Sequence, residues 1–193
     1  MTEHSDEDLV RQCRAGEIKS FDLLVERHQR TIFNLALRMV RDSDDAADVS
    51  QSVFVKAYEN LERFDPQFKF FSWLYRIAVN ESLNALEQKK RFEGLEGNDL
   101  AADTADEKDD EAIREERRIQ DGLMMLKVDQ RAVIILKHMQ GLSYREIGQI
   151  LDLPEKTVKS RLHTARQIMA GHLSRRGIDP SPCGSRTRTA PCT

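Results

Sequence analysis

The chain of 193 residues has no long hydrophobic run. No apolar stretch approaches the ~20 residues that a membrane-spanning helix needs, and the polar, acidic N-terminus does not resemble a secretory signal peptide. We therefore expect a cytoplasmic protein with no membrane insertion.

Cysteines are few, and their spacing matches no common zinc or redox motif. Cys13 lies among apolar residues and is interpreted as a small core side chain. Cys183 and Cys192 lie in a polar tail, where a metal- or redox-responsive role is an open alternative, although metal ligands are usually spaced more tightly.

Motifs of catalysis are also missing. The sequence contains no phosphate-binding G-x-x-x-x-G-K, no dinucleotide-binding G-x-G-x-x-G, no H-E-x-x-H and no cluster of Cys and His. The five histidines are scattered. The sequence therefore predicts a protein that is not an enzyme and that needs no cofactor.

The net charge of −3 hides an uneven distribution. Residues 93–121 contain twelve acidic and four basic residues, a net charge of −8, whereas residues 141–176 have a net charge of +4. This asymmetry indicates an acidic connector followed by a basic module that can approach phosphate.

The periodicity of apolar residues predicts an all-α fold, with no strand alternation and no internal repeat. Helices are expected over 6–15, from 21 past 39, from 42 to 61 and over 70–90, then two helices from 111 to 139 and two shorter ones. Residues 63–69, with Pro66, are expected to form a loop. We expect two small helical domains, 1–91 and 112–173, joined by a flexible acidic linker (92–111) and followed by a disordered tail (174–193).

The strongest local signal is a helix-turn-helix over residues 141–162. Ser143 and Glu146 form an S-x-x-E capping box, flanked by Leu142 and Ile147 as a hydrophobic staple. The turn 152–154 separates the two helices. The second helix would face inward with Val158, Leu162, Ala165 and Ile168 or Met169.

The outward face of this second helix mixes cations with short polar side chains, as a helix in the DNA major groove requires. It carries Lys156, Lys159, Ser160, His163, Thr164 and Gln167. The alternative without DNA binding is a pair of amphipathic helices with an ordinary charged, solvated exterior. A stand-alone helix-turn-helix regulator is also open, because residues 155–159 resemble the equivalent helix of LuxR-type response regulators.

Half of the aromatic residues lie within the twelve residues 64–75. Aromatic rings beside cations can stack unpaired bases and hold a single strand. Phe71, Trp73 and Leu74 are better interpreted as core, whereas Phe68 and Lys69, in the loop, are the better contact candidates.

Two N-terminal motifs distinguish these alternatives. The segments 48–58 (DVSQSVFVKAY) and 71–84 (FSWLYRIAVNESLN), in this order and spacing, resemble region two of extracytoplasmic-function (ECF) sigma factors, and the C-terminal motif looks like region four. The resemblance covers about residues 5–173.

The resemblance implies three contact surfaces. One binds the core bacterial RNA polymerase at the β′ clamp through Asp48, Gln51, Phe54, Lys56 and Tyr58. One melts and holds the −10 element through Phe68, Lys69, Arg76, Asn80 and Asn84. One reads the −35 duplex through Lys156, Thr157, Lys159, Ser160, Arg161, His163, Thr164 and Gln167.

The resemblance also implies contact with the polymerase β flap, promoter DNA as a ligand, and an anti-sigma factor as a regulatory partner. Thr164 departs from the family pattern, because arginine is common at this position. Threonine cannot make a bidentate contact with guanine, so we expect a different −35 sequence.

Overall fold

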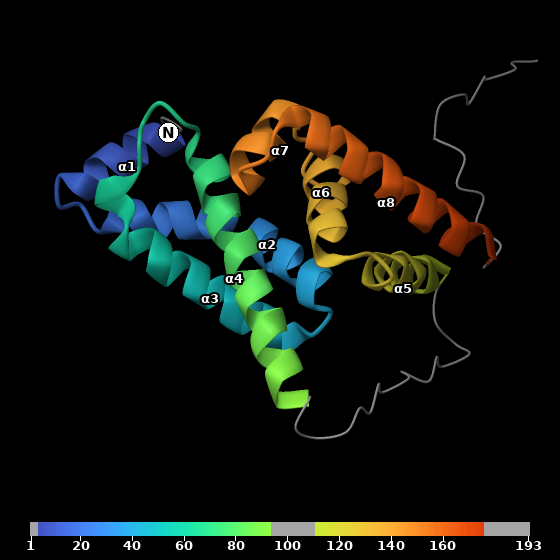
Figure 1. The fold of residues 1–193 in the computed structure, drawn as a ribbon. Helices are drawn as coiled ribbons and strands as arrows, with labels where there is room; N and C mark the ends of the chain where they lie inside the picture. The colour runs from blue at the N-terminus through green and yellow to red at the C-terminus, as the bar shows by residue number, and fades with distance from the viewer. Residues whose placement is uncertain (1–3, 94–110, 176–193) are drawn as a thin grey trace, which may run out of the picture.

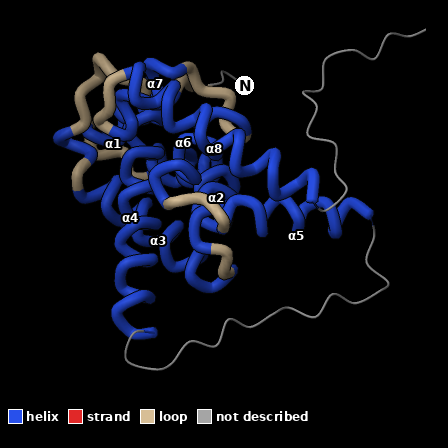
Figure 2. The backbone as a smooth tube through the Cα atoms, turned by 45° about the vertical axis from the view of Figure 1, so that its right-hand side comes forward, coloured by secondary structure: helices blue, strands red, loops and turns tan. Residues whose placement is uncertain are grey.

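A computed structural model of the chain describes residues 4–93 and 111–175. Over these two ranges it consists of α-helices, one short 3-10 helix and connecting loops, with no strand (Figure 2). The prediction of an all-α fold is confirmed. None of the helices in these ranges is long and apolar enough to span a bilayer.

The N-terminal domain contains α1 (Asp6–Arg14), α2 (Lys19–Val40), α3 (Ser43–Glu59), the 3-10 helix η1 (Leu61–Arg63) and α4 (Phe70–Glu93). Helices α2, α3 and α4 all pack on one another, and α1 packs on α2. Their shared core contains the apolar residues that the periodicity assigned to the inner faces, among them Leu24, Leu35, Met39, Val53 and Leu74.

Local chemistry explains where these helices begin and end. Gly16 follows α1 with a φ of 99°, which is easiest for glycine. Asp42 caps α3 by accepting hydrogen bonds from the backbone N–H groups of Asp44 and Asp45. The hydrogen bond from Asp45 is the main cause of the lowered pKa of Asp42, as expected for a carboxylate at the positive end of a helix.

The C-terminal domain contains α5 (Glu111–Met124), α6 (Val128–His138), α7 (Tyr144–Leu151) and α8 (Glu155–Arg175). Helix α8 packs on the other three. The two domains are in contact, since α7 lies beside the first half of α4 while α5 and α6 pack on α2 (Figure 1).

Some boundaries differ from the sequence-based expectation. Helix α8 has 21 residues and is not short, so Ser174 and Arg175 are helical rather than part of a tail. The cause is tertiary, because the last turns of α8 pack on α5: a Cβ atom at Gly122 would meet Met169 at 3.0 Å and His172 at 3.3 Å. Helix α4 continues to Glu93, past the expected end at residue 91, whereas α5 begins at Glu111 as the periodicity predicts. The rest of the expected linker and tail, with Cys183 and Cys192, lies outside the described residues.

Candidate nucleic-acid interface

Helices α7 and α8 form the predicted helix-turn-helix. The hydroxyl of Ser143 accepts from the backbone N–H of Glu146, and the Glu146 carboxylate accepts from the backbone N–H of Ser143 at 2.9 Å. Asp152 ends α7 in a left-handed conformation, with a φ of 54°. The carbonyl of Gly148 then accepts from the backbone N–H of Leu153 at 2.9 Å, which sets the tight turn into α8.

The two faces of α8 differ as predicted. Val158, Leu162 and Ala165 are buried, and Met169 packs against the core, whereas Ile168 is 37% exposed. Of the two residues that the sequence left open for the inward face, Met169 and not Ile168 therefore belongs to it. The outward face is exposed at all six predicted positions: Lys156, Lys159, Ser160, His163, Thr164 and Gln167.

Three candidate −35 residues have surroundings that the sequence did not indicate. Thr157 is half-buried. Arg161 is half-buried and forms an ion pair with Asp129 of α6 at 3.2 Å. The hydroxyl of Thr164 donates to the carbonyl of Ser160 at 3.2 Å, so its proton is used within α8 while its oxygen can still accept a hydrogen bond.

The Glu146 carboxylate joins the two domains. It accepts hydrogen bonds from the backbone and the hydroxyl of Ser143, and from Lys69 Nζ at 3.0 Å. These bonds, led by the backbone bond from Ser143, lower the pKa of Glu146 to about 2. The carboxylate is thus charged throughout the physiological range.

We expect Glu146→Gln to reduce the acid sensitivity of folding. Because the folded-state pKa of about 2 lies below the ordinary 4.5, the charge of Glu146 stabilises the fold fully above pH ~4.5 and progressively less toward pH ~2. Glutamine keeps the capping acceptor but does not titrate. Urea unfolding at several pH values should give a smaller loss of stability between pH ~5 and ~3 for the variant than for the wild type, and equal losses would contradict this origin.

The aromatic residues of the segment 64–75 include a packed cluster and one exposed ring. Phe64, Phe70 and Trp73 contact one another, with ring centroids 5.3 to 5.8 Å apart. Phe68, in the loop before α4, is 48% exposed. Lys69 Nζ lies 5.3 Å from the centroid of the Phe71 ring. The Lys69 ammonium thus lies on Phe71 and pairs with Glu146 rather than with the exposed Phe68, and the contact of Phe68 and Lys69 with a DNA strand stays a prediction.

The remaining −10 candidates lie along α4. Arg76, Asn80 and Asn84 are exposed and are spaced four residues apart, so they form one row on the helix. Arg76 and Asn80 line a cavity of about 160 Å³ whose other wall includes residues 150–153 of α7 and its turn. Asn84 lies farther along, where its amide donates to Glu81 at 3.1 Å.

Helix α3 carries the candidate polymerase contacts. Asp48, Gln51, Lys56 and Tyr58 are exposed and Phe54 is half-buried. Lys56 forms an ion pair with Glu81 of α4 at 2.6 Å. Val55 on the same helix is 50% exposed and was not among the predicted residues, because valine within an amphipathic pattern is usually assigned to the core.

Comparison with known proteins relates these surfaces to a family. The family model for Sigma-70 region 2 matches residues 24–92 and that for Sigma-70, region 4 matches residues 116–169. The ECF RNA polymerase sigma-E factor of Escherichia coli (strain K12) is 36% identical, over 86% of this chain and 92% of the relative. The chain belongs to the ECF sigma-70 family of sigma factors.

Other relatives agree with this sigma-factor assignment. The ECF RNA polymerase sigma factor SigW of Bacillus subtilis (strain 168) is 33% identical over 85% of this chain and 94% of its own. A solved structure of CnrH in complex with the cytosolic domain of CnrY has a TM-score of 0.71 at 27% identity, covering 89% of this chain and 99% of that one. The sigma factor RpoE of Bartonella quintana, solved with the anti-sigma factor NepR, shares the fold, with a TM-score of 0.67 at 24% identity over 81% of this chain and 98% of that one.

The protein is therefore an ECF RNA polymerase sigma factor that directs transcription initiation. It is not an enzyme, and as a sigma factor it binds core RNA polymerase and promoter DNA. Region 2 comprises α2 to α4 and region 4 comprises α5 to α8. The region 2 match separates the chain from a stand-alone helix-turn-helix regulator.

Sequence reasoning missed the residues of this sigma factor that join region 2 to region 4. Arg131 of α6 is the clearest case, since it is 6% exposed and donates to the carbonyl of Met39 in α2. Its sequence position carries no local signal for that contact. In the described ranges no group of three or more His, Cys, Asp or Glu residues is placed to hold a metal ion.

Proposed function

We propose that this sigma factor divides promoter recognition and polymerase binding among three helices and one loop. Helix α8 reads the −35 duplex, the 64–69 loop and α4 hold the −10 strand, and α3 binds the polymerase β′ clamp. The outward face of α8 carries the proposal, because its two lysines and four short polar or imidazole side chains are all exposed while the opposite face is buried. Lysines suit phosphates, and the other side chains suit base edges in the major groove.

For the −10 element we infer that Phe68 stacks on an extruded base and that Arg76, Asn80 and Asn84 follow the strand. Support comes from the exposure of Phe68 next to a buried aromatic cluster and from the straight row along α4. A positioned aromatic ring recovers part of the few kcal/mol that extruding a base costs.

For the polymerase we infer a contact through Asp48, Gln51, Phe54, Lys56 and Tyr58. Four of these side chains are exposed on α3. The Tyr58 ring packs edge to face against the Phe21 ring, with ring centroids 5.1 Å apart. An aromatic ring supported from behind and exposed on one side is a common anchor in interfaces.

The remaining partners follow from the family. We infer that region 4 contacts the polymerase β flap, and that an anti-sigma factor restrains the protein, since a structural neighbour was solved with such a factor. The division into 1–91, 92–111, 112–173 and 174–193 stays part of this proposal, with the first bound moved to Glu93, the second domain beginning at Glu111 and α8 ending at Arg175. We infer that the protein acts in the cytoplasm, because bacterial RNA polymerase is located in the cytoplasm.

The test is run-off transcription with purified bacterial core polymerase on promoters randomised at both elements. Transcripts that depend on this protein, enriched for paired −35 and −10 sequences, are the expected result. The Asn80→Ala variant should lose selectivity at the −10 element while keeping the −35 preference. A library with no enrichment at the −35 element would overturn the assignment of α8.

We expect Thr164→Arg to change which −35 sequence is preferred. The proton of the Thr164 hydroxyl is used within its own helix, so threonine offers a base only a methyl group and an acceptor oxygen, whereas arginine would favour guanine by about 1–3 kcal/mol. The same promoter library should show roughly a 10- to 100-fold shift toward guanine at one −35 position. Gln167→Arg, at another outward position of α8, is the matched control and should shift a different position.

A further inference from the structure

Arg14, the last residue of α1, is hydrogen-bonded to a segment between 47 and 50 positions further along the chain. Its Nε and Nη2 atoms donate to the carbonyl of Leu61 at 3.1 and 2.7 Å. Nη2 also donates to the carbonyl of Glu62 at 3.0 Å and to that of Phe64. The guanidinium carbon Cζ lies 6.0 Å from the centroid of the Phe64 ring. Arg14 thus ties the end of η1 to the end of α1.

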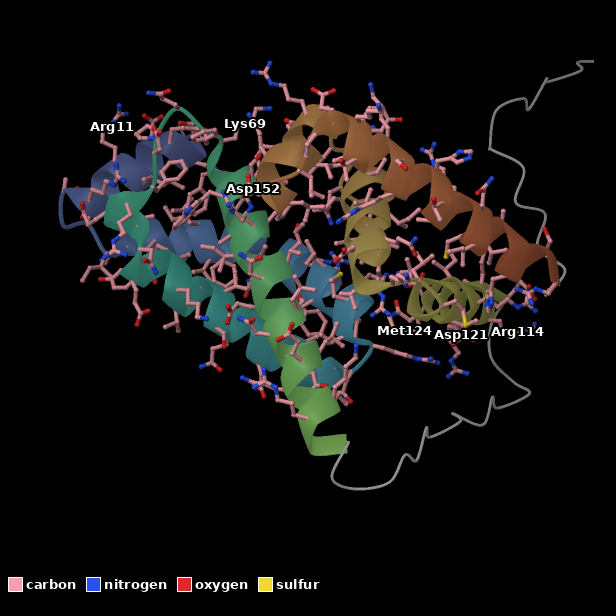
Figure 3. All side chains as sticks on the ribbon, viewed as in Figure 1. Arg11, Lys69, Arg114, Asp121, Met124 and Asp152 are labelled. Carbon is pink, nitrogen blue, oxygen red and sulfur yellow. The ribbon has the colours of Figure 1, made fainter. Side chains whose placement is uncertain are left out.

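The sequence indicates only a general role for this arginine. Arg11 and Arg14 both stand in the last turn of α1, where a cation suits the negative end of the helix dipole. Their surroundings nevertheless differ. The Arg11 side chain is 77% exposed and pairs with Asp8 of its own helix, and Figure 3 shows it on the outer side of α1. Arg14 is half-buried and reaches the carbonyls of another element.

The contacts of Arg14 depend on the shape of the guanidinium group. The Leu61 carbonyl also accepts from the backbone N–H of Phe64 at 3.1 Å, but the Glu62 and Phe64 carbonyls receive their hydrogen bonds from Arg14. A planar fork of N–H donors can hold three neighbouring acceptors at once, whereas a lysine ammonium acts as a point charge. The direction in which the chain leaves η1 is therefore set by arginine geometry.

The segment that Arg14 holds leads directly into the 64–69 loop. The Phe64 ring is 3% exposed and belongs to the packed aromatic cluster. A turn follows, in which the backbone N–H of Phe68 donates to the carbonyl of Asp65 at 3.1 Å. The Phe68 ring is 48% exposed. Because so short a segment joins Phe64 to Phe68, the direction of the chain at Phe64 determines where the Phe68 ring lies relative to α4.

We propose that Arg14 is a positioning residue for −10 recognition, which fixes the 64–69 loop so that Phe68 is presented to an extruded base. The inference rests on the proposed contact of Phe68 with the −10 strand and adds a residue that itself touches no DNA. Helix α1 lies outside residues 24–92, the range that matches Sigma-70 region 2. The physical reason is preorganisation, because a ring already held in place loses less conformational entropy when it binds a base.

Amide hydrogen exchange, measured by NMR on the full chain, tests the anchoring without DNA. Arg14→Met keeps the aliphatic stem but has no donor, so the amides of Phe64 and Phe68 should exchange about tenfold faster. The amide of Leu35, in the core of α2, should keep its rate. Arg14→Lys should give intermediate rates, and Arg11→Met, the matched control on the same helix, should change none. Unchanged rates at Phe64 and Phe68 in Arg14→Met, or an equal rise at Leu35, would overturn the proposal.

A double-mutant cycle with Phe68→Ala measures whether Arg14 acts through that ring. The probe is a fluorescent single strand that carries the −10 sequence selected by transcription, and the protein is the holoenzyme formed with core polymerase. Phe68→Ala should raise the Kd about tenfold and Arg14→Met about fivefold. The double variant should bind no more weakly than Phe68→Ala alone, because no ring is left to position.

The outcomes of this cycle separate the two proposals. Effects that multiply in the double variant, or an unchanged Kd in Arg14→Met, would overturn the positioning role and leave the Phe68 contact in place. If Phe68→Ala leaves the Kd unchanged while the exchange rates rise as expected, the proposed −10 contact fails. Arg14 would then anchor the loop without serving recognition.

Discussion

Gly148→Ala should destabilise the C-terminal domain by about 1–3 kcal/mol and weaken −35 duplex binding. A Cβ atom at Gly148 would lie 2.6 Å from the carbonyl oxygen of Leu153, a backbone atom that cannot rotate away. The turn between α7 and α8 must then widen, which also breaks the hydrogen bond from Leu153 to the Gly148 carbonyl. The orientation of α8 relative to α7 would change with it.

Gly171→Ala is the matched control, because it makes the same replacement in α8 where nothing lies within 4 Å of the new atom. Alanine is the better helix former there, so stability should rise by about 0.5–1 kcal/mol. Urea unfolding followed by circular dichroism measures both changes, and fluorescence anisotropy with the selected −35 duplex measures binding. Equal stability of the two variants would show that the turn has room for a side chain.

Arg131→Met should cost about 3 kcal/mol of stability, although methionine fits an apolar interior. The guanidinium donates to the carbonyls of Leu123 and Met39, with longer contacts to those of Met124 and Leu126. Methionine would remove the donor to the Met39 carbonyl at the end of α2 and to the carbonyls of Met124 and Leu126 after α5, whereas the Leu123 carbonyl would keep the backbone N–H of Leu126 at 3.2 Å. Burial lowers the pKa of Arg131, but arginine remains charged at neutral pH.

Arg131→Lys separates charge from geometry. Lysine is a point charge without the planar fork, so we expect it to recover only part of the lost stability. Arg145→Met, at an exposed position of α7, should change stability by less than about 0.5 kcal/mol. Urea unfolding of the three variants, monitored by circular dichroism and by the fluorescence of Trp73, distinguishes these outcomes. A loss at Arg131 no greater than at Arg145 would contradict the capping role.

The Arg131 variants also report on the coupling of the domains. Trp73, the single tryptophan, lies in region 2 and lines a cavity that α7 also lines, whereas three of the four carbonyls that Arg131 contacts are in region 4. In the wild type the circular dichroism signal and the Trp73 fluorescence should change over the same range of urea concentration. In Arg131→Met the circular dichroism change should begin at lower urea than the Trp73 change, because region 4 loses more contacts.

The amino-acid sequence by itself determined the helices, their inner faces and the family. Each of these depends on residues close together in the chain: Ser143 and Glu146 cap α7 from three positions apart, Asp42 caps α3, and the buried faces of α2 and α8 repeat every three or four residues. The outward face of α8 followed for the same reason, since it is what remains when the buried positions are assigned.

Only the tertiary structure decided which charges face each other and what each helix covers. Lys69 donates to Glu146, which lies 77 positions away in the chain. Arg161 forms an ion pair with Asp129 of α6. The end of α8 stays helical because α5 packs on it. Charged and polar side chains occur throughout the exposed faces, so composition and periodicity cannot select their partners. Those pairings depend on how one domain is placed on the other, which no residues close together in the chain can indicate.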